Sequence, residues 1–202
     1  KKNRKPGYNG FVSLGAADHD RYNGTFNLNI KQGRVNVTGF YSVNSNDVPV
    51  NGYTNKTIYS PGDSTYKYYN QNSISQFNTN FQIGRIALDY SINNRNTLTF
   101  AGTIVRGVFN VNGTQNSQFL KADGSTYETG VRNVLPLNKF NNQQTQVIWK
   151  KTFPKKGKEL TIDANYSWGG SSNSQDWIST VNDANGVALA YQPGLTQIRG
   201  EN

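Results

Sequence analysis

The residues of this chain best suited to chemistry stand together in a short acidic segment near the N-terminus. His19 is the only histidine, and Asp18 and Asp20 flank it. An imidazole between two carboxylates is suited to proton transfer or to holding a divalent metal ion. The same three residues also suit a solvated turn between two strands. The segment is therefore a candidate acid–base or metal site, and a polar turn is its simpler interpretation.

Other signatures of enzymatic chemistry do not occur in the sequence. There is no glycine-rich phosphate loop between a strand and a helix, no nucleophile elbow and no cysteine for disulfides or thiolate metal sites. Three Asp-containing segments resemble parts of calcium loops but lack the regular spacing of acidic residues, and turn chemistry explains them better: 63–64, 123–124 and 183–186. We therefore expect no catalytic residues, no cofactor and no metal.

Composition favours a sheet with one apolar and one hydrated face. The 202 residues suffice for one domain, but only 34% are hydrophobic and 16% charged, and Asn, Gln, Ser and Thr fill the difference. This is too polar for two buried faces, and its aromatic content of 12% is too high for a disordered chain. The net charge of +9 is spread over segment ends and turns, and no recognition motif accompanies it. We expect no nucleic-acid partner.

Apolar and polar residues alternate along several stretches, of which 22–31 and 160–168 are good examples. A period of two residues is typical of strands with one apolar wall. Seven strands are predicted, at about 10–17, 21–31, 34–43, 75–90, 97–111, 142–153 and 159–169. Within 75–90 the apolar positions change phase near Gly84, which predicts a β-bulge.

If consecutive strands alternate in direction, the connections at one end of the sheet are short and those at the other end are mostly long. The connections at 32–33, 92–96 and 154–158 lie on one side, and all are short. On the other side lie 18–20, which is short, and three stretches predicted to be long loops: 44–74, 112–141 and the residues beyond 170. This asymmetry is typical of transmembrane barrels. No run approaches the roughly 18 apolar residues of a membrane helix, so any crossing must be by strands.

The predicted fold class is therefore all-β: an antiparallel up-and-down meander that forms part of a transmembrane β-barrel, with short periplasmic turns and long extracellular loops.

With these segments in view, the chain resembles part of a TonB-dependent outer-membrane receptor of the β-barrel family common in Bacteroidetes. The resemblance covers roughly residues 1–170. It rests on the opening 1–10, on 20–24 followed by 27–29, on 88–90 and 94–98, and on 150–153 with 157–161. Such receptors have about 22 strands around a plug domain and import nutrients with energy relayed by TonB.

The resemblance implies a domain plan, partners and a location. Residues 1–9 would be the plug-to-barrel junction, 10–169 barrel strands and loops, and 170–202 a loop-rich continuation of the barrel. The implied partners are outer-membrane lipid, the remainder of the barrel and plug, a TonB-type energy-coupling system, a surface lipoprotein and a nutrient ligand. Seven strands without a plug do not make such a receptor, so we expect a fragment, located in a bacterial outer membrane.

The aromatic residues divide into two groups. Aromatic side chains near strand ends or on apolar faces are expected at the membrane interface, the alternative being the core of a soluble sandwich; they are Tyr22, Tyr41, Tyr90, Trp149, Phe153, Tyr166 and Trp168. The first predicted long loop carries five tyrosines that are candidates for stacking on sugars or peptides, the alternative being packing within the loop; they are Tyr53, Tyr59, Tyr66, Tyr68 and Tyr69.

Two other architectures remain open at this point. One is a soluble β-sandwich or adhesin-like module that binds carbohydrate through aromatic loops. The other is a small self-contained outer-membrane barrel of about eight strands, with the residues after Gly170 supplying the last strand.

Overall fold

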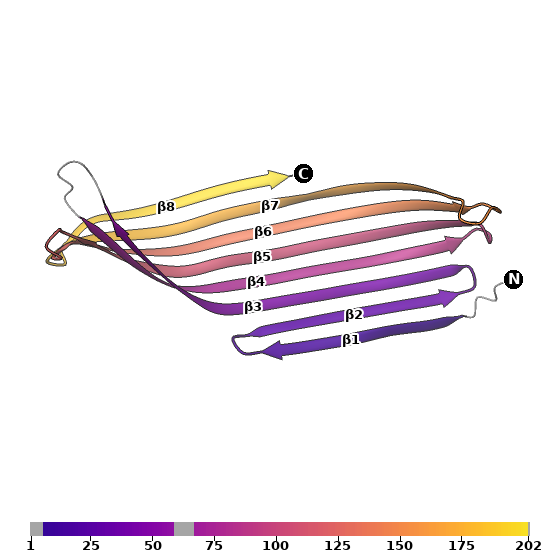
Figure 1. Cartoon of the computed structure of the whole chain (residues 1–202), viewed down its shortest axis with the longest axis horizontal. Helices are drawn as coiled ribbons and strands as arrows, with labels where there is room; N and C mark the ends of the chain where they lie inside the picture. The colour runs from indigo at the N-terminus through magenta and orange to yellow at the C-terminus, as the bar shows by residue number, and fades with distance from the viewer. Residues whose placement is uncertain (1–5, 59–66, 202) are drawn as a thin grey trace.

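The computed structural model describes residues 6–58 and 67–201, with side chains through Leu189. They form one antiparallel sheet whose eight strands lie side by side in chain order (Figure 1). The strands are β1 (Gly7–Ala17), β2 (Arg21–Gln32), β3 (Val35–Thr57), β4 (Tyr68–Ser91), β5 (Asn96–Leu120), β6 (Thr126–Thr152), β7 (Glu159–Asp183) and β8 (Ala188–Glu201). The predicted all-β meander is confirmed. No helix of the described residues is long and apolar enough to cross a membrane.

The sheet is open at both edges. Among the described residues β1 pairs only with β2, and β8 pairs only with β7, along residues 170–182 of that strand. A closed eight-stranded barrel and a two-sheet sandwich are therefore not the architecture of the described chain. Because no second layer covers the sheet, Ala101 is the one buried hydrophobic side chain among the residues described.

The three long loops predicted on one side were wrong in extent, because most of their residues are strand. In the stretch 44–74, β3 continues to Thr57 and β4 begins at Tyr68. The stretch 112–141 contains the end of β5 and the start of β6, which only residues 121–125 connect. The loop-rich continuation predicted for 170–202 is the second half of β7 together with β8.

The connections on the other side are short, as predicted. We call this side of the sheet the proximal end; its connections are residues 33–34, 92–95 and 153–158, at the right of Figure 1. Gly33 and Gly157 adopt positive φ angles of 57° and 79° there, a conformation that glycine enters without steric cost. At the opposite, distal end the strands β3 to β7 continue far past the hairpin that joins β1 and β2 (Figure 1).

Two of the calcium-like segments form distal turns. The Asp123 carboxylate accepts hydrogen bonds from the backbone N–H of Ser125 at 2.9 Å and from its hydroxyl at 2.7 Å. Likewise, Asp183 accepts from the backbone N–H groups of Asn185 and Val187, at 2.9 and 2.8 Å. These carboxylates satisfy the backbone of their own turns, which agrees with turn chemistry. The third segment, Asp63-Ser64, lies outside the described residues.

The bulge predicted near Gly84 was wrong. β4 pairs without a break with β3 and with β5 through this residue, and the register shifts lie instead beside distal turns, at Phe119/Leu120 and Val181/Asn182. The change of phase is therefore a change of face. Phe77, Phe81 and Ile83 point to one side of the sheet, and Ile86, Leu88 and Tyr90 point to the other.

A glycine in the middle of β5 makes room for an aromatic ring of the next strand. Gly107 pairs with Phe140 of β6 and with Phe81 of β4, so the three share one face. A Cβ atom on Gly107 would lie only 2.1 Å from the Phe140 ring, whose centroid is 6.1 Å from that of Phe81. The ring therefore lies over the glycine, which leaves no space for a larger residue.

We expect Gly107→Ala to destabilise the folded sheet by about 1–3 kcal/mol, the usual cost of overpacking, because Phe140 must move away from Phe81. Gly102→Ala is the matched control, since a Cβ there has nothing within 4 Å, and it should change the free energy of unfolding by less than about 0.5 kcal/mol. Urea titration followed by circular dichroism measures both. Equal effects of the two substitutions would contradict the packing account.

Candidate functional site

The continuous register assigns every residue of the sheet to one of two faces, and one face carries an apolar belt beside the proximal end. We define the apolar belt by the following residues, which β1 to β7 present on the face of Leu88 in the proximal half of the sheet: Val12, Leu14, Phe26, Leu28, Ile30, Val35, Val37, Tyr41, Val43, Ile86, Leu88, Tyr90, Leu98, Phe100, Ile104, Val147, Trp149, Leu160, Ile162, Ala164, Tyr166 and Trp168. Large members of the belt lie open, as Ile86 (63% exposed), Phe100 (47%) and Ile162 (52%) show.

The opposite face of the same region is polar and connected by hydrogen bonds across strands. We call this surface the polar wall. The Asp89 carboxylate accepts hydrogen bonds from Asn36 at 3.2 Å and Thr99 at 2.6 Å, which come from the two neighbouring strands. These three side chains link β3, β4 and β5 on the face away from the belt.

A second network of the polar wall extends further across the sheet. The Arg85 guanidinium donates to the Thr103 hydroxyl and to the Gln146 side-chain oxygen, at 3.0 Å each. The Gln146 amide group in turn donates to both oxygens of Asp163, at 3.1 and 2.9 Å. A cation, an amide and a carboxylate from β4, β6 and β7 are thus held in one line. Such a surface is suited to contact with water, because its charged groups can bind water molecules and other polar side chains.

The distal half of the sheet carries apolar side chains on both faces, with its phenylalanines on the face of the polar wall. Eight of its apolar residues lie on the face of the polar wall and form what we call the distal patch: Val48, Phe77, Phe81, Phe109, Val111, Val134, Phe140 and Trp177. Other distal apolar residues, among them Ile74, Leu135 and Ile178, lie on the belt face. Arg132 lies over the Trp177 ring, 5.0 Å from its centroid, and donates to the Ser179 hydroxyl at 2.8 Å. The remaining distal residues on the belt face are mostly Asn, Gln, Ser and Thr, so the continuous belt gives way to a mixed surface there.

The seven predicted interface aromatics lie near the two borders of the belt. Tyr90, Trp149 and Phe153 lie toward the proximal end, and Phe153 is near two cations, with Lys151 and Lys158 Nζ at 5.3 and 5.0 Å from its centroid. The other four lie nearer the distal border: Tyr22, Tyr41, Tyr166 and Trp168. The rings of Tyr166 and Trp168 stack with centroids 5.5 Å apart. Their placement at a membrane interface stays a prediction.

The five candidate ligand-binding tyrosines do not form one described cluster. Tyr59 and Tyr66 lie outside the described residues. Tyr53 is on β3 and 81% exposed, and its face of the sheet is the one opposite Tyr69. Tyr69 packs on Phe119 at 5.0 Å between centroids and donates to Gln71 at 2.8 Å, and Tyr68 lies on the other face. Ligand stacking by these residues stays a prediction.

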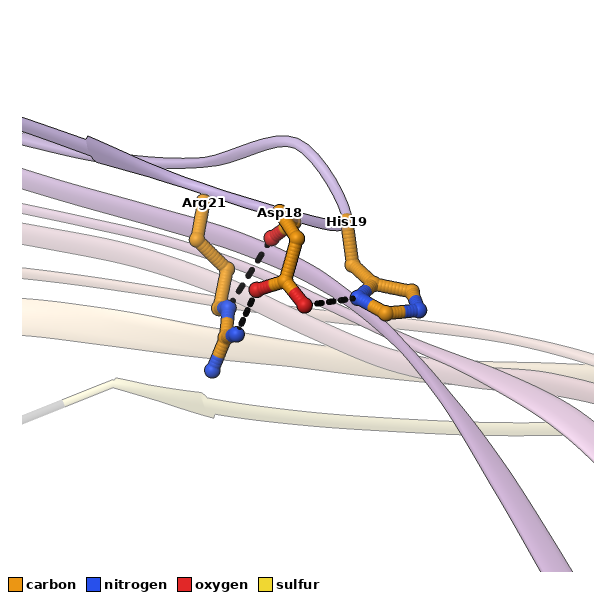
Figure 2. A network of polar contacts seen from close by, with 3 residues as sticks. All are labelled: Asp18, His19 and Arg21. Carbon is orange, nitrogen blue, oxygen red and sulfur yellow. Dashed lines mark hydrogen bonds and ion pairs between the residues drawn. The ribbon is translucent and has the colours of Figure 1, made fainter.

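The His19 segment is the turn between β1 and β2 (Figure 2). His19 and Asp20 adopt positive φ angles of 57° and 49°, and the His19 Nδ1 atom lies 3.1 Å from the Asp18 carboxylate. The Arg21 guanidinium pairs with the same carboxylate and donates to the Asp18 carbonyl oxygen at 3.0 Å. The Arg21 guanidinium and the His19 imidazole thus both contact the Asp18 carboxylate. No group of three metal-ligating side chains occurs among the described residues.

Sequence reasoning missed the polar-wall networks of Arg85, Asp89, Gln146 and Asp163. A signal was present, because each of these residues occupies the polar phase of a strand whose other phase belongs to the belt. Their hydrogen-bond partners could not be identified from the sequence without the strand register, which places Asn36 beside Asp89 although 53 positions separate them.

Comparison with known proteins found no matching family model, no similar curated protein and no similar solved structure.

The Arg21 guanidinium, by its hydrogen bond and its charge, holds the pKa of Asp18 below its usual value of 3.8, and His19 adds to the effect. A depressed pKa in the folded chain means that Asp18 stabilises the turn above the pKa of the unfolded chain, and that this contribution is lost as the pH falls through the folded value. We expect Arg21→Gln to raise the pKa of Asp18 toward 3.8. Carbon-detected NMR titration of the carboxyl group measures it, with Arg34→Gln at the proximal end as control. An unchanged pKa in Arg21→Gln would refute this assignment.

Proposed function

We propose that this chain is a segment of the wall of a transmembrane β-barrel, in an outer-membrane receptor of the TonB-dependent class that takes up a nutrient. The observation that carries the proposal is the height of the apolar belt. It covers nine residues on β3 and on β7, 35–43 and 160–168, and seven on β5, 98–104, whereas on β6 only Val147 and Trp149 belong to it. A tilted strand needs about 9–11 residues to cross the hydrocarbon core of a bilayer.

Strand length supports the same assignment. Strands β3 to β7 contain 23–27 residues each, which corresponds to about 80 Å at roughly 3.3 Å per residue. A bilayer core is only about 30 Å thick, so more than half of each strand would extend into water. The end of the continuous belt supports this division, because strands that leave the lipid would need an outer face richer in Asn, Gln, Ser and Thr.

The open edges assign partners to the chain. Inside lipid an unpaired strand edge is costly, because no water satisfies its backbone groups. The free edge of β1, and that of β7 over residues 159–169, would therefore pair with the remaining strands of the barrel. The polar wall would face the lumen and the plug domain, and the distal patch would pack against groups inside the barrel above the membrane. The finer identification, including the TonB-type coupling and a surface lipoprotein, rests on the sequence resemblance.

A pair of arginine substitutions on one strand tests the proposal. Val147→Arg introduces a charge in the apolar belt, and Gln144→Arg introduces the same charge three residues away on the polar wall. In detergent micelles or lipid bilayers we expect the first to lower the free energy of unfolding by about 2–4 kcal/mol, the cost of a charge on a lipid-facing position near the midplane. The second should cost less than about 1 kcal/mol.

The measurement is urea unfolding followed by circular dichroism, in buffer and in lipid. The proposal requires that the β-spectrum appear only with detergent or lipid. A cooperatively folded monomer in plain buffer, with equal effects of the two arginines, would refute it for this chain.

A further inference from the structure

Two hollows lie one above the other on the belt face of β4 to β7. The first, of about 460 Å³, is lined by Gly84, Ile86, Gly102, Ile104 and Trp168, among others. The second, of about 620 Å³, lies on the distal side of the first and has a mixed lining that includes Arg106, Lys139, Asn141, Val108 and Phe140.

The register places the two hollows next to each other along the strands on the same face, and we call them together the groove. One row across the sheet consists of Gly84, Ile104, Gln143 and Trp168, and the next row on the same face consists of Gln82, Arg106, Asn141 and Gly170. Successive residues of one face lie two positions apart along each strand. The floor of the groove therefore passes from the apolar belt to the cationic hollow without crossing another element.

The belt part of the groove has the shape and polarity for a hydrocarbon chain. Gly84 and Gly102 leave its floor without side chains, and a Cβ atom at Gly102 would meet nothing within 4 Å. Ile86 and Ile104 form apolar walls, and the Trp168 ring closes the side on β7. A slot with a glycine floor lets an extended chain approach the backbone and gain contact area that a filled surface denies it.

The distal part carries two cations at the border of the belt. Arg106 on β5 pairs with Asn141, and Lys139 on β6 lies one row beyond, beside Ser172. Both cations are exposed, and within the part of the chain whose side chains are described neither forms an ion pair. The amide groups of Asn80, Gln82 and Asn141 supply neutral hydrogen-bond donors around them. Arginine and lysine surrounded by amides are suited to the oxygens of a phosphate group.

We propose that this groove binds a phosphate-bearing acyl lipid, with an acyl chain in the glycine-floored slot and the phosphate against Arg106 and Lys139. The inference rests on the proposed function, because it requires the belt to face lipid. It goes further in assigning one defined lipid site, on β4 to β7, to a surface that would otherwise contact lipid in general.

The test uses Trp168 as the reporter in the full chain. Phe replaces Trp149 and Trp177, which leaves Trp168 as the only tryptophan. The chain is reconstituted in phosphatidylcholine bilayers that contain increasing mole fractions of phosphatidic acid with brominated acyl chains, which quench a nearby indole. We expect stronger quenching than with equally brominated phosphatidylcholine, whose phosphate carries a choline group.

Two variants and their matched controls separate the headgroup from the acyl chain. Arg106→Gln with Lys139→Gln should weaken the apparent affinity for brominated phosphatidic acid about tenfold, because each exposed charge contact contributes a factor of up to about five. Lys155→Gln with Lys156→Gln removes the same charge from a proximal turn and should leave the affinity unchanged. Gly102→Leu fills the slot and should abolish the preference, whereas Gly39→Leu, another open glycine on the belt face, should retain it.

The outcomes distinguish this inference from the proposed function. A β-spectrum in bilayers together with equal quenching by the two brominated lipids, or an unchanged affinity in the Arg106→Gln, Lys139→Gln variant, would overturn the lipid site alone. Complete displacement of the lipid by millimolar inorganic phosphate would also overturn it, because the acyl chain would then contribute nothing. Failure to form any β-spectrum in bilayers would overturn both the barrel wall and the site that depends on it.

Discussion

The structure depends on an unbroken period of two residues, maintained by the backbone ladders between neighbouring strands. Because β4 pairs through Gly84 on both sides without a bulge, a residue's position in the chain decides its face over the whole length of the sheet. Even opposite Pro136, which has no N–H to donate, the register of β5 and β6 is the same before and after the gap, and Asn110 accepts a hydrogen bond from the backbone of Asn138 at 2.9 Å. The apolar belt, the polar wall and the distal patch all follow from this constraint.

The apolar side chains are arranged differently in the two halves of the sheet. Near the proximal end the exposed apolar side chains occupy one face, while Arg85, Asp89 and Asp163 occupy the other. Beyond Ile83 toward the distal end, the phenylalanine and tryptophan rings lie on the second face, where Phe140 lies over Gly107. A soluble two-layer protein would keep its apolar residues on one face along whole strands. The proposed wall, partly in lipid and partly in water, would require such a change of face.

The sequence was sufficient to predict the proximal half of the sheet, because strict alternation with Val, Leu, Ile and Tyr on one phase is a strong strand signal. It also located the short turns, where Gly33 and Gly157 supply positive φ angles. The distal strands escaped prediction because Asn, Ser and Gly dominate them, a composition that is also typical of loops. Their strand conformation is held by neighbouring strands, a tertiary effect that local propensity does not contain.

The residues of the candidate site also differ in whether the sequence alone could select them. The interface aromatics could be selected because they share the belt phase, whereas the tyrosines of the first predicted loop were grouped by proximity in sequence, which a strand does not preserve. Tyr68 and Tyr69 are adjacent in the chain and point to opposite faces. Cross-strand networks such as that of Arg85 and Gln146, 61 positions apart, follow from pairing alone. The cationic end of the groove likewise needs four strands in register.

The end of the continuous belt is tested most directly by scanning one strand with a spin label. The chain has no cysteine, so single cysteines introduced in turn from Thr97 to Gln115 on β5 each report one position. In bilayers, the spin label should be most accessible to oxygen dissolved in lipid at the even positions from Leu98 to Ile104. At even positions beyond Arg106 its accessibility to oxygen should fall, and its accessibility to a water-soluble nickel chelate should rise. Even positions that are equally accessible to the chelate along the whole strand would contradict the account.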